Sequence, residues 1–259
     1  MNHIDNDVAS INCNEGLHEV ISRFCDIVRN NPSVLRPVKD YDEDVRAILS
    51  SEGFTLYPTV KTTTLFYDPG TDCFFKTIHP LSLKHKVLYY CLNKAAALYS
   101  LSEEMRVRGV KTQSVAAFGF LKGGRRPFYA SPRVEGESLF DVLIKKKQTL
   151  TMDEYRKAVD EVIKLHNTGY WLGDAHLAHV FMEKGEVSGL IDIDSIRKNR
   201  PYYLKNIAKD LAGLNHPELP LSDEEKLSLL HYYMEQTGIE GNKKLPELLT
   251  YYTNRRWKD

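Results

Sequence analysis

Two acidic side chains, Asp174 and Asp192, lie eighteen residues apart in the most informative stretch of the chain. Asp174 follows Gly173 in a polar segment, and Asp192 ends the apolar run Leu190-Ile191. A carboxylate in a loop can accept a proton from a bound hydroxyl, and a carboxylate at the end of a buried strand can hold Mg²⁺. These are two of the groups that phosphoryl transfer requires. The common alternative for Asp174 is a turn or helix-capping residue.

The elements around these carboxylates predict how they are positioned. Residues 181–189 predict a hairpin with a tight turn at Lys184-Gly185, and a helix over 152–168 precedes the polar loop. Helix, loop, hairpin and Asp in this order are typical of the phosphotransfer core of kinase-like folds. Asp194 would share a strand face with Asp192 if the strand continued, whereas a bend after Asp192 would separate them.

His179 lies five residues after Asp174, where kinase-like loops usually have an Asn that binds a second metal ion. Its ring could bind metal, contact phosphate or hydrogen-bond within the loop, and imidazole is a less natural ligand for Mg²⁺ than an amide oxygen. Together with these two residues, His166 and His176 also permit a zinc site. We rank zinc below phosphoryl transfer, because side chains three residues apart share a face only in a helix and this segment has a loop sequence.

Lys76 is the candidate cation for the phosphates. It interrupts an apolar strand, 73–78, that pairs with 62–67 across the turn Asp68-Pro69-Gly70-Thr71-Asp72. The alternative is an edge-strand lysine that faces water. Its position one strand before a long helix, expected over 81–108, favours the functional interpretation.

The remaining pattern predicts an α+β fold with two lobes. Residues 1–54 predict an N-terminal helical extension after a polar leader, and 55–135 predict a small antiparallel-sheet lobe with one long helix, whose apolar face includes Val87, Leu88 and Leu92. Residues 136–259 predict a mainly helical lobe, with helices over 138–147, 152–168, 203–214, 223–237 and 245–256. This arrangement is similar to that of protein kinases.

Composition excludes several classes of protein. The chain has 35 Lys and Arg against 35 Asp and Glu, so its net charge gives no indication of a nucleic-acid partner. Its four cysteines form no CxxC pair, so we expect neither a zinc knuckle nor a disulfide framework. Neither a signal peptide nor a membrane span is visible in the sequence. These features predict a cytoplasmic location, with membrane contact limited to a peripheral one.

Four segments carry a resemblance to a known family. The segment 165–182 resembles the lipopolysaccharide kinase family, which phosphorylates inner-core sugars, Kdo or heptose, in Gram-negative bacteria and is similar in fold to protein kinases. The resemblance continues through 190–197, and 209–214 (KDLAGL) looks like the family's Lys-Asp-Leu-Ala-x-Leu helix. The segment 134–139 is similar to the hinge between the lobes. In all, the resemblance covers roughly residues 60 to 256.

The resemblance implies a role for each candidate residue. Lys76 would hold the phosphates of ATP, and Asp174 would be the catalytic base. Asp192 would bind Mg²⁺, and His179 would support or share that site. Glu135 would lie at the hinge beside the adenine, and its alternative is a plain turn residue.

Asp210 would brace the catalytic loop from a buried helix, and its alternative is an ordinary helix charge.

The sequence also departs from the family pattern in three places. The small-lobe helix has no Glu at the expected position, although Glu103 and Glu104 lie further along. Residues 62–64 are threonines where a glycine-rich loop would cover the phosphates, and Leu172-Gly173 replaces the His-Arg that often precedes the catalytic Asp.

The expected function is therefore that of a sugar kinase, a phosphotransferase with an alcohol group as acceptor that uses ATP and Mg²⁺. Its acceptor would be a hydroxyl of the lipopolysaccharide inner core, reached at the cytoplasmic face of the inner membrane. The basic runs Lys145-Lys146-Lys147 and Arg255-Arg256 could face that anionic acceptor or the membrane. Two alternatives stay open, a soluble small-molecule kinase of the aminoglycoside or choline type and a pseudokinase scaffold that transfers nothing.

Overall fold

The computed structural model describes residues 1–35, 43–57, 63–199 and 203–258. The chain divides into two compact units: unit 1 comprises Met1–Glu103 and Ser114–Arg133, and unit 2 comprises Glu104–Gln113 and Val134–Asp259. The α+β class is confirmed as a mixed structure with a large antiparallel sheet and many helices. The lobe boundaries expected at residues 54 and 135 stay a prediction.

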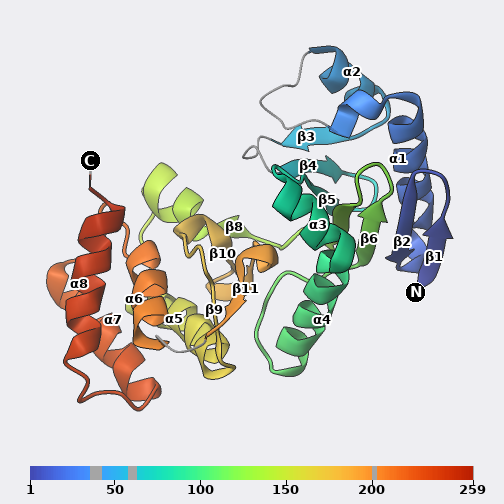
Figure 1. Ribbon diagram of the computed structural model, residues 1–259. Helices are drawn as coiled ribbons and strands as arrows, with labels where there is room; N and C mark the ends of the chain where they lie inside the picture. The colour runs from blue at the N-terminus through green and yellow to red at the C-terminus, as the bar shows by residue number, and fades with distance from the viewer. Residues whose placement is uncertain (36–42, 58–62, 200–202, 259) are drawn as a thin grey trace. The chain divides into compact units, whose positions relative to one another are not determined.

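Within the described residues, unit 1 is built on a seven-stranded antiparallel sheet in the order β1-β2-β6-β7-β5-β4-β3 (Figure 1). The strands are β1 (Asn2–Asp5), β2 (Ala9–Cys13), β3 (Thr55–Tyr57), β4 (Thr63–Asp68), β5 (Cys73–Ile78), β6 (Ala117–Leu121) and β7 (Arg126–Pro132). The predicted hairpin is present as β4 and β5, with Leu65 opposite Lys76, and Thr62 lies outside the described residues. Because β5 lies between β4 and β7, Lys76 is half-buried on an interior strand, and the edge-strand alternative is wrong.

The polar leader predicted at the start of the chain is wrong, because residues 2–13 form the β1–β2 hairpin. β2 pairs with β6, so the hairpin extends the sheet. Its apolar residues alternate with polar ones, and Ile4, Ile11 and Cys13 are buried while their neighbours face outward. Two strands of four and five residues give too short a pattern to distinguish from a polar tail.

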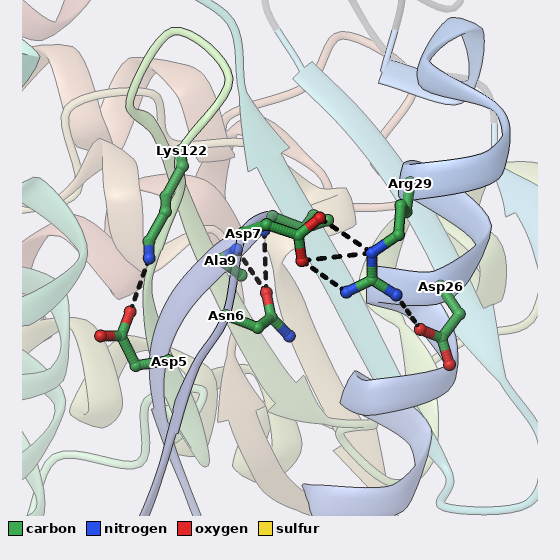
Figure 2. A network of polar contacts seen from close by, with 8 residues as sticks. Asp5, Asn6, Asp7, Ala9, Asp26, Arg29 and Lys122 are labelled. Atoms are coloured by element: carbon green, nitrogen blue, oxygen red, sulfur yellow. Dashed lines mark hydrogen bonds and ion pairs between the residues drawn. The ribbon is translucent and has the colours of Figure 1, made fainter.

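A polar network connects this hairpin with the neighbouring helix and turn (Figure 2). Asn6 Oδ1 accepts two backbone hydrogen bonds within the β1–β2 turn, both of 2.9 Å. The Arg29 guanidinium donates to both carboxylate oxygens of Asp7, and Lys122 pairs with Asp5 at 2.8 Å. These ion pairs are exposed, so each contributes little to stability, and the network mainly fixes the position of the β1–β2 turn.

An aromatic core fills one face of the unit 1 sheet. The helices of this unit are α1 (His18–Asn30), α2 (Glu43–Ser51), α3 (Leu83–Cys91) and the first part of α4 (Lys94–Val107). Phe24 of α1 stacks on Phe128 and Phe66 stacks on Phe75, in both cases with ring centroids 5.6 Å apart. Side chains alternate along a strand, so Lys76, which follows Phe75, lies on the opposite face of the sheet.

The single helix predicted over 81–108 is wrong, because the structure has two helices, α3 and α4. The backbone is extended at Leu92 (φ −114°, ψ 129°), and the Asn93 side chain then caps α4 by accepting a 3.0 Å hydrogen bond from a backbone N–H three residues on. Val87, Leu88 and Leu92, expected on the buried face, are exposed. No helix in the described ranges is both long and apolar enough to span a bilayer.

Unit 2 is mainly helical (Figure 1). It contains the end of α4, the helices α5 (Met152–Asn167), α6 (Tyr203–Leu214), α7 (Asp223–Gln236) and α8 (Lys244–Arg256), and the strands β8 (Glu137–Ser138), β9 (Tyr170–Trp171), β10 (Val180–Glu183), β11 (Glu186–Leu190) and β12 (Arg197–Lys198). The last four predicted helices are confirmed to within one residue at each end. The helix expected over 138–147 is a shorter π-helical turn, Phe140–Lys145.

Helices α5 and α7 both begin with a capping box. Thr151 and Glu154 cap α5, and Ser222 and Glu225 cap α7, with each side chain bonded to the backbone of the other residue. This reciprocal arrangement satisfies two N–H groups that a helix start leaves without partners. The core of unit 2 lies between α5, α6, α7 and α8, where Ile207, Tyr233 and Leu245 are buried.

Candidate functional site

Asp174 and His179 lie in the loop that joins β9 to β10. The loop turns at Gly173 (φ +82°), where an added Cβ would lie 2.2 Å from the carbonyl oxygen of Ser195, so only glycine fits. The Asp174 side chain is 66% exposed, which leaves its carboxylate accessible to a substrate. His179 Nδ1 lies 2.9 Å from the carbonyl oxygen of Asp174. The imidazole therefore connects the two ends of the loop, which is one of the three roles considered for it.

A buried carboxylate on α6, that of Asp210, holds the start of this loop. Its oxygens accept hydrogen bonds from the backbone N–H groups of Leu172 at 2.5 Å and Gly173 at 3.3 Å, and Oδ2 lies 3.1 Å from Nε2 of His166. Burial of a carboxylate is costly unless donors surround it. Asp210 thus makes the contacts that a bracing role requires, while the catalytic role of the loop stays a prediction.

Helix α6 also approaches the loop closely at Gly213. An added Cβ there would lie 2.1 Å from the carbonyl oxygen of Ala175, the residue after Asp174. Such a distance is far inside van der Waals contact, so any side chain at this position would displace the loop or the helix. Gly213 and Asp210 therefore fix the loop from the same helix, one by close approach and one by hydrogen bonds.

The described part of the chain offers no ligand set for the zinc alternative. His166 is buried, with Nδ1 2.8 Å from the hydroxyl of Tyr233 and Nε2 facing Asp210. Both ring nitrogens are thus engaged inside the helical core. Among the residues that the structure describes, no group of three or more His, Cys, Asp or Glu side chains could hold a metal ion.

The hairpin predicted between the two carboxylates is confirmed as β10 and β11, with the turn at Lys184-Gly185. After it, the N–H of Ile191 donates to the carbonyl oxygen of His179 at 2.9 Å, which connects the hairpin to the loop. Asp192 then has a left-handed backbone (φ 65°, ψ 46°), so the chain bends and Asp194 lies in a short 3₁₀ turn. A left-handed non-glycine residue is uncommon, and such strain is often found at functional sites.

The backbone of Asp192 is held in this conformation by its neighbours. Its carbonyl oxygen accepts hydrogen bonds from the N–H of Ser195 at 2.9 Å and the hydroxyl of Ser195 at 2.8 Å, and its own N–H donates to Gln113 at 3.3 Å. Proteins commonly bind Mg²⁺ through one or two carboxylates together with substrate phosphates, rather than through a complete cage of side chains. The half-buried carboxylate of Asp192 fits that requirement without a further protein ligand.

Lys76 and Glu135 belong to different units. Lys76 lies on β5 in unit 1, whereas Glu135 lies near the start of the main segment of unit 2. The carbonyl oxygen of Glu135 accepts a 2.6 Å hydrogen bond from Ser188, and Gly136 (φ +84°) leaves no room for a Cβ, which would lie 2.0 Å from the carbonyl oxygen of Met182. The turn is therefore tightly packed on the β10–β11 hairpin. The adenine role of Glu135 and the phosphate role of Lys76 stay predictions.

The two basic runs have partners in the structure. Each lysine of 145–147 forms an ion pair, respectively with Asp141, Glu137 and Glu218. Arg256, at the end of α8, pairs with Asp174 through Nη2 and Oδ1 at 3.2 Å. The lysine run is thus largely neutralised, and one C-terminal arginine contacts the candidate base itself.

Four ring side chains surround His176, two residues after Asp174. Phe140, His179, His216 and Trp257 have ring centroids between 5.4 and 6.5 Å from that of His176. Sequence reasoning missed Phe140, His216 and Trp257, because no local spacing connects residues that lie so far apart along the chain. The cluster places an aromatic surface beside the loop.

The surroundings of His176 favour the neutral form of its ring. Burial lowers the pKa of His176, and the nearby His179, Arg256 and His216 lower it further. A neutral ring suits its hydrogen bond, in which Nδ1 accepts from the backbone N–H of Ala178 at 3.0 Å. His176 therefore serves as an acceptor that shapes the loop.

No protein-family model matches the chain. No curated protein matches it either. Among solved structures it is similar to a high-resolution crystal structure of WbdD, at 14% identity over 77% of this chain and 50% of that chain, with a TM-score of 0.49. A medium-resolution structure described as the bifunctional kinase-methyltransferase WbdD has 14% identity over 74% of this chain and 47% of that chain, with a TM-score of 0.47.

A co-crystal structure of WbdD and the kinase inhibitor LY294002 has 11% identity, covers 82% of this chain and 61% of that chain, and has a TM-score of 0.41. The chain thus spans about half the length of these structures, between 47% and 61%. A likeness with TM-scores below 0.5 decides neither the fold family nor the function, so the argument for function depends on the residues of the site.

Proposed function

We propose that the chain is a phosphotransferase with a protein-kinase-like fold, which transfers a phosphoryl group from ATP to an alcohol group of a sugar. The main support is the buried Asp210, which holds the loop that presents the exposed carboxylate of Asp174. The β10–β11 hairpin and the left-handed Asp192 follow in the order typical of a phosphotransfer core. A loop held this firmly from a separate helix suits a side chain that must be positioned accurately.

In this proposal, the side chains of the loop position the acceptor. Asp174 would accept the proton of the attacking hydroxyl, and His179 would keep the loop in shape through its contact with the Asp174 carbonyl. Asp192 would hold Mg²⁺, which when bound neutralises charge on the phosphates. Lys76 and Glu135 would bind the phosphates and the adenine, as the family resemblance implies.

The acceptor that we propose is a hydroxyl of the lipopolysaccharide inner core, on Kdo or heptose. Its support is the resemblance of 165–182 and 190–197 to the lipopolysaccharide kinase family. Transfer to such an acceptor would take place at the cytoplasmic face of the inner membrane, through a peripheral contact.

The test is Mg²⁺-dependent transfer of phosphate from ATP to purified lipopolysaccharide core by the full chain. We expect Asp174→Asn and Asp192→Asn each to lower the rate by about 10² or more, because each removes a group that acts in the transition state. Asp153→Asn is the matched control, since Asp153 is an exposed carboxylate on α5 of the same unit. Transfer that survives in both site variants would refute the assignment of the two carboxylates.

The ion pair between Arg256 and Asp174 favours a second candidate, a pseudokinase scaffold, because the candidate base already has a partner. The same assay distinguishes the two functions. Nucleotide binding without transfer, in both the wild type and Arg256→Ala, would favour the scaffold. Transfer to aminoglycosides or choline but not to core sugars would instead indicate a soluble small-molecule kinase.

A further inference from the structure

A mainly apolar cavity of about 330 Å³ lies among α5, α6 and α7 in unit 2. Val162 of α5, Leu211 of α6 and Leu230 of α7 line it, and Leu177 and Val180 extend the lining to the loop of Asp174. Sites for small molecules have volumes of about 300 to 1,000 Å³ and are mostly apolar with a few polar groups. The cavity therefore has the size and the chemistry of a binding site.

One polar group in this cavity has no partner. The Tyr155 side chain lines the cavity and is 6% exposed, and its hydroxyl makes no hydrogen bond with any described residue. Buried hydroxyls are nearly always bonded, because an unpaired one loses its hydration without compensation. Burial raises the pKa of Tyr155 to about 12, with a further contribution from Glu225 and Glu154. The hydroxyl is thus protonated at neutral pH and can donate to a ligand.

Helix α7 closes the cavity incompletely. Leu227 lines it and is nevertheless 50% exposed, while Leu229 and Leu230 are half-buried. Leucines in a completed core would be almost fully buried, since close packing leaves few voids. The α7 leucines thus have apolar surface that an apolar ligand could cover.

The mouth of the cavity is cationic. Lys226 and Asn215 line both the cavity and a neighbouring open pocket of about 760 Å³, to which Arg255 and Lys258 also contribute. Neither Lys226, Arg255 nor Lys258 forms an ion pair with a described residue. One carboxylate, that of Asp223, lines the cavity and none lines the pocket. The mouth is therefore positive in a chain without net charge.

We propose that this cavity binds a single-chain anionic amphiphile, such as a fatty-acid anion. The alkyl chain would lie among the leucines between α5, α6 and α7, and the charged group would lie at the mouth beside Lys226. Tyr155 would donate its hydrogen bond to an oxygen of the ligand. Burial of the alkyl chain supplies the affinity, and the cations select an anion over a neutral alcohol. This proposal does not rest on phosphate transfer by the chain.

The first test uses dodecanoate, with dodecanol and acetate as probes that keep only the chain or only the charge. Titration calorimetry on the full chain, below the micelle concentration, should give saturable dodecanoate binding at least tenfold tighter than that of dodecanol, and none with acetate. From octanoate to dodecanoate, the affinity should rise about fourfold for each methylene buried. Equal affinity for dodecanol and dodecanoate would overturn the proposal.

The location is tested with Trp171→Phe, which leaves Trp257 of the neighbouring pocket as the one tryptophan of the chain. Dodecanoate should change the fluorescence emission of Trp257, and the titration should give the same dissociation constant as calorimetry. Phosphatidylglycerol vesicles serve as the second probe. Binding to vesicles without binding of monomeric dodecanoate would overturn the proposal, because it would place the contact on a surface and not in the cavity.

Two variants separate ligand binding from stability. Leu227→Glu adds a carboxylate to the cavity lining at a half-exposed position and should abolish dodecanoate binding, whereas Leu88→Glu, at a 44% exposed leucine of α3, should leave it unchanged. Tyr155→Phe should raise the melting temperature of the free protein, because it removes an unpaired hydroxyl, yet weaken dodecanoate binding about tenfold. If Tyr155 had only a structural role, Tyr155→Phe would change the melting temperature and leave dodecanoate binding unchanged. Unchanged binding in both Leu227→Glu and Tyr155→Phe would overturn the proposal.

Discussion

Two buried carboxylates, Asp68 in unit 1 and Asp210 in unit 2, both accept backbone hydrogen bonds but over different distances along the chain. Asp68 Oδ2 accepts from the N–H and the hydroxyl of Thr71, three residues on and both at 2.8 Å, and Oδ1 pairs with Arg23 at 2.7 Å. Asp210 accepts from N–H groups 38 and 37 residues earlier, and it faces His166 instead of an arginine.

The difference shows that a buried carboxylate that accepts backbone hydrogen bonds can serve two purposes. Asp68 closes the β4–β5 turn, which already contains Pro69 and Gly70, so it strengthens a turn that the local sequence favours. Asp210 holds a loop that contains no helix or strand at Asp174 and that has little reason to adopt one conformation by itself. The short-range carboxylate stabilises a unit, and the long-range carboxylate positions a candidate functional loop.

The largest expected effect comes from removing each carboxylate. Asp210→Ala should lower the free energy of unfolding by about 3 to 4 kcal/mol, because it leaves the buried N–H of Leu172 and the buried ring of His166 without a partner. Asp68→Ala should lower it by less, about 1 to 3 kcal/mol, because its partners Thr71 and Arg23 are partly exposed. Phosphate transfer, measured where both variants are folded by circular dichroism, should fall strongly in Asp210→Ala and remain near wild type in Asp68→Ala. Asp210→Asn keeps one acceptor oxygen and should recover part of the loss. Equal loss of transfer in the two alanine variants would show that Asp210 has no special role in positioning the candidate loop.

The next effect concerns His79, a buried imidazole of unit 1 that has no carboxylate partner among the described residues, in contrast to His166 beside Asp210. His79 Nε2 lies 2.6 Å from the hydroxyl of Thr64, and burial lowers the pKa of His79 to about 4, with Arg126 contributing. The unfolded chain, with a histidine pKa of about 6.5, then binds more protons than the folded chain in this range. The contribution of His79 to the free energy of unfolding should therefore be complete above pH about 6.5. It should fall by about 3 kcal/mol as the pH is lowered to 4.

Urea unfolding at a series of pH values checks this expectation. Wild type should lose stability as the pH falls through this window, and His79→Gln should lose less, because glutamine does not titrate. Identical slopes for the two proteins would show that other groups account for the pH dependence.

Several regular elements of both units followed from local signals in the sequence, although the break at Leu92 between α3 and α4 was missed. The hairpin 181–189 has Lys184-Gly185 at its tip, and α5 has a Thr-x-x-Glu capping box at its start. The β1–β2 hairpin was missed because its hydrophobic positions are few and its partner, β6, lies about a hundred residues away. Propensity and pattern carry no information about such distant pairing.

The candidate loop was also predicted from local signals, and its contacts with distant parts of the chain were not. Glycine before Asp174, and an apolar run before Asp192, are local signals for carboxylates that lie just outside regular elements. The contacts of Arg256 and Trp257 with this loop depend on how α8 packs, and neither has a local signal. The cavity beside Tyr155 is a further case, since a void between helices is a property of packing alone.

A smaller effect is expected at two glycines where the backbones of neighbouring segments approach closely. An added Cβ at Gly213 in unit 2 or at Gly119 in unit 1 would lie 2.1 Å from a carbonyl oxygen, that of Ala175 or of Ser10. Each glycine-to-alanine change should cost about 2 kcal/mol in chemical denaturation, since overpacking forces the backbone to move. Only Gly213→Ala should also lower phosphate transfer, because only there does the displaced carbonyl adjoin Asp174. Loss of transfer in Gly119→Ala would contradict this division.

The smallest expected effect comes from an exposed pair. Arg256→Ala removes the partner of Asp174, and Arg29→Ala removes the partner of Asp7 and Asp26 in unit 1. Both changes should leave the free energy of unfolding almost unchanged, because the pairs are exposed. The two should differ in phosphate transfer. Under the proposed function, Arg256 would compete with an acceptor hydroxyl for Oδ1 of Asp174, so its removal should raise the rate about twofold, equivalent to about 0.4 kcal/mol.

Salt provides the internal control for this last expectation. Because the pair is exposed, high ionic strength should screen it in the wild type and bring the two rates together. Transfer that is slower in Arg256→Ala at every salt concentration would mean that the arginine orients the carboxylate instead of occupying it. In that case the long-range positioning of the loop would depend on α8 as well as on α6.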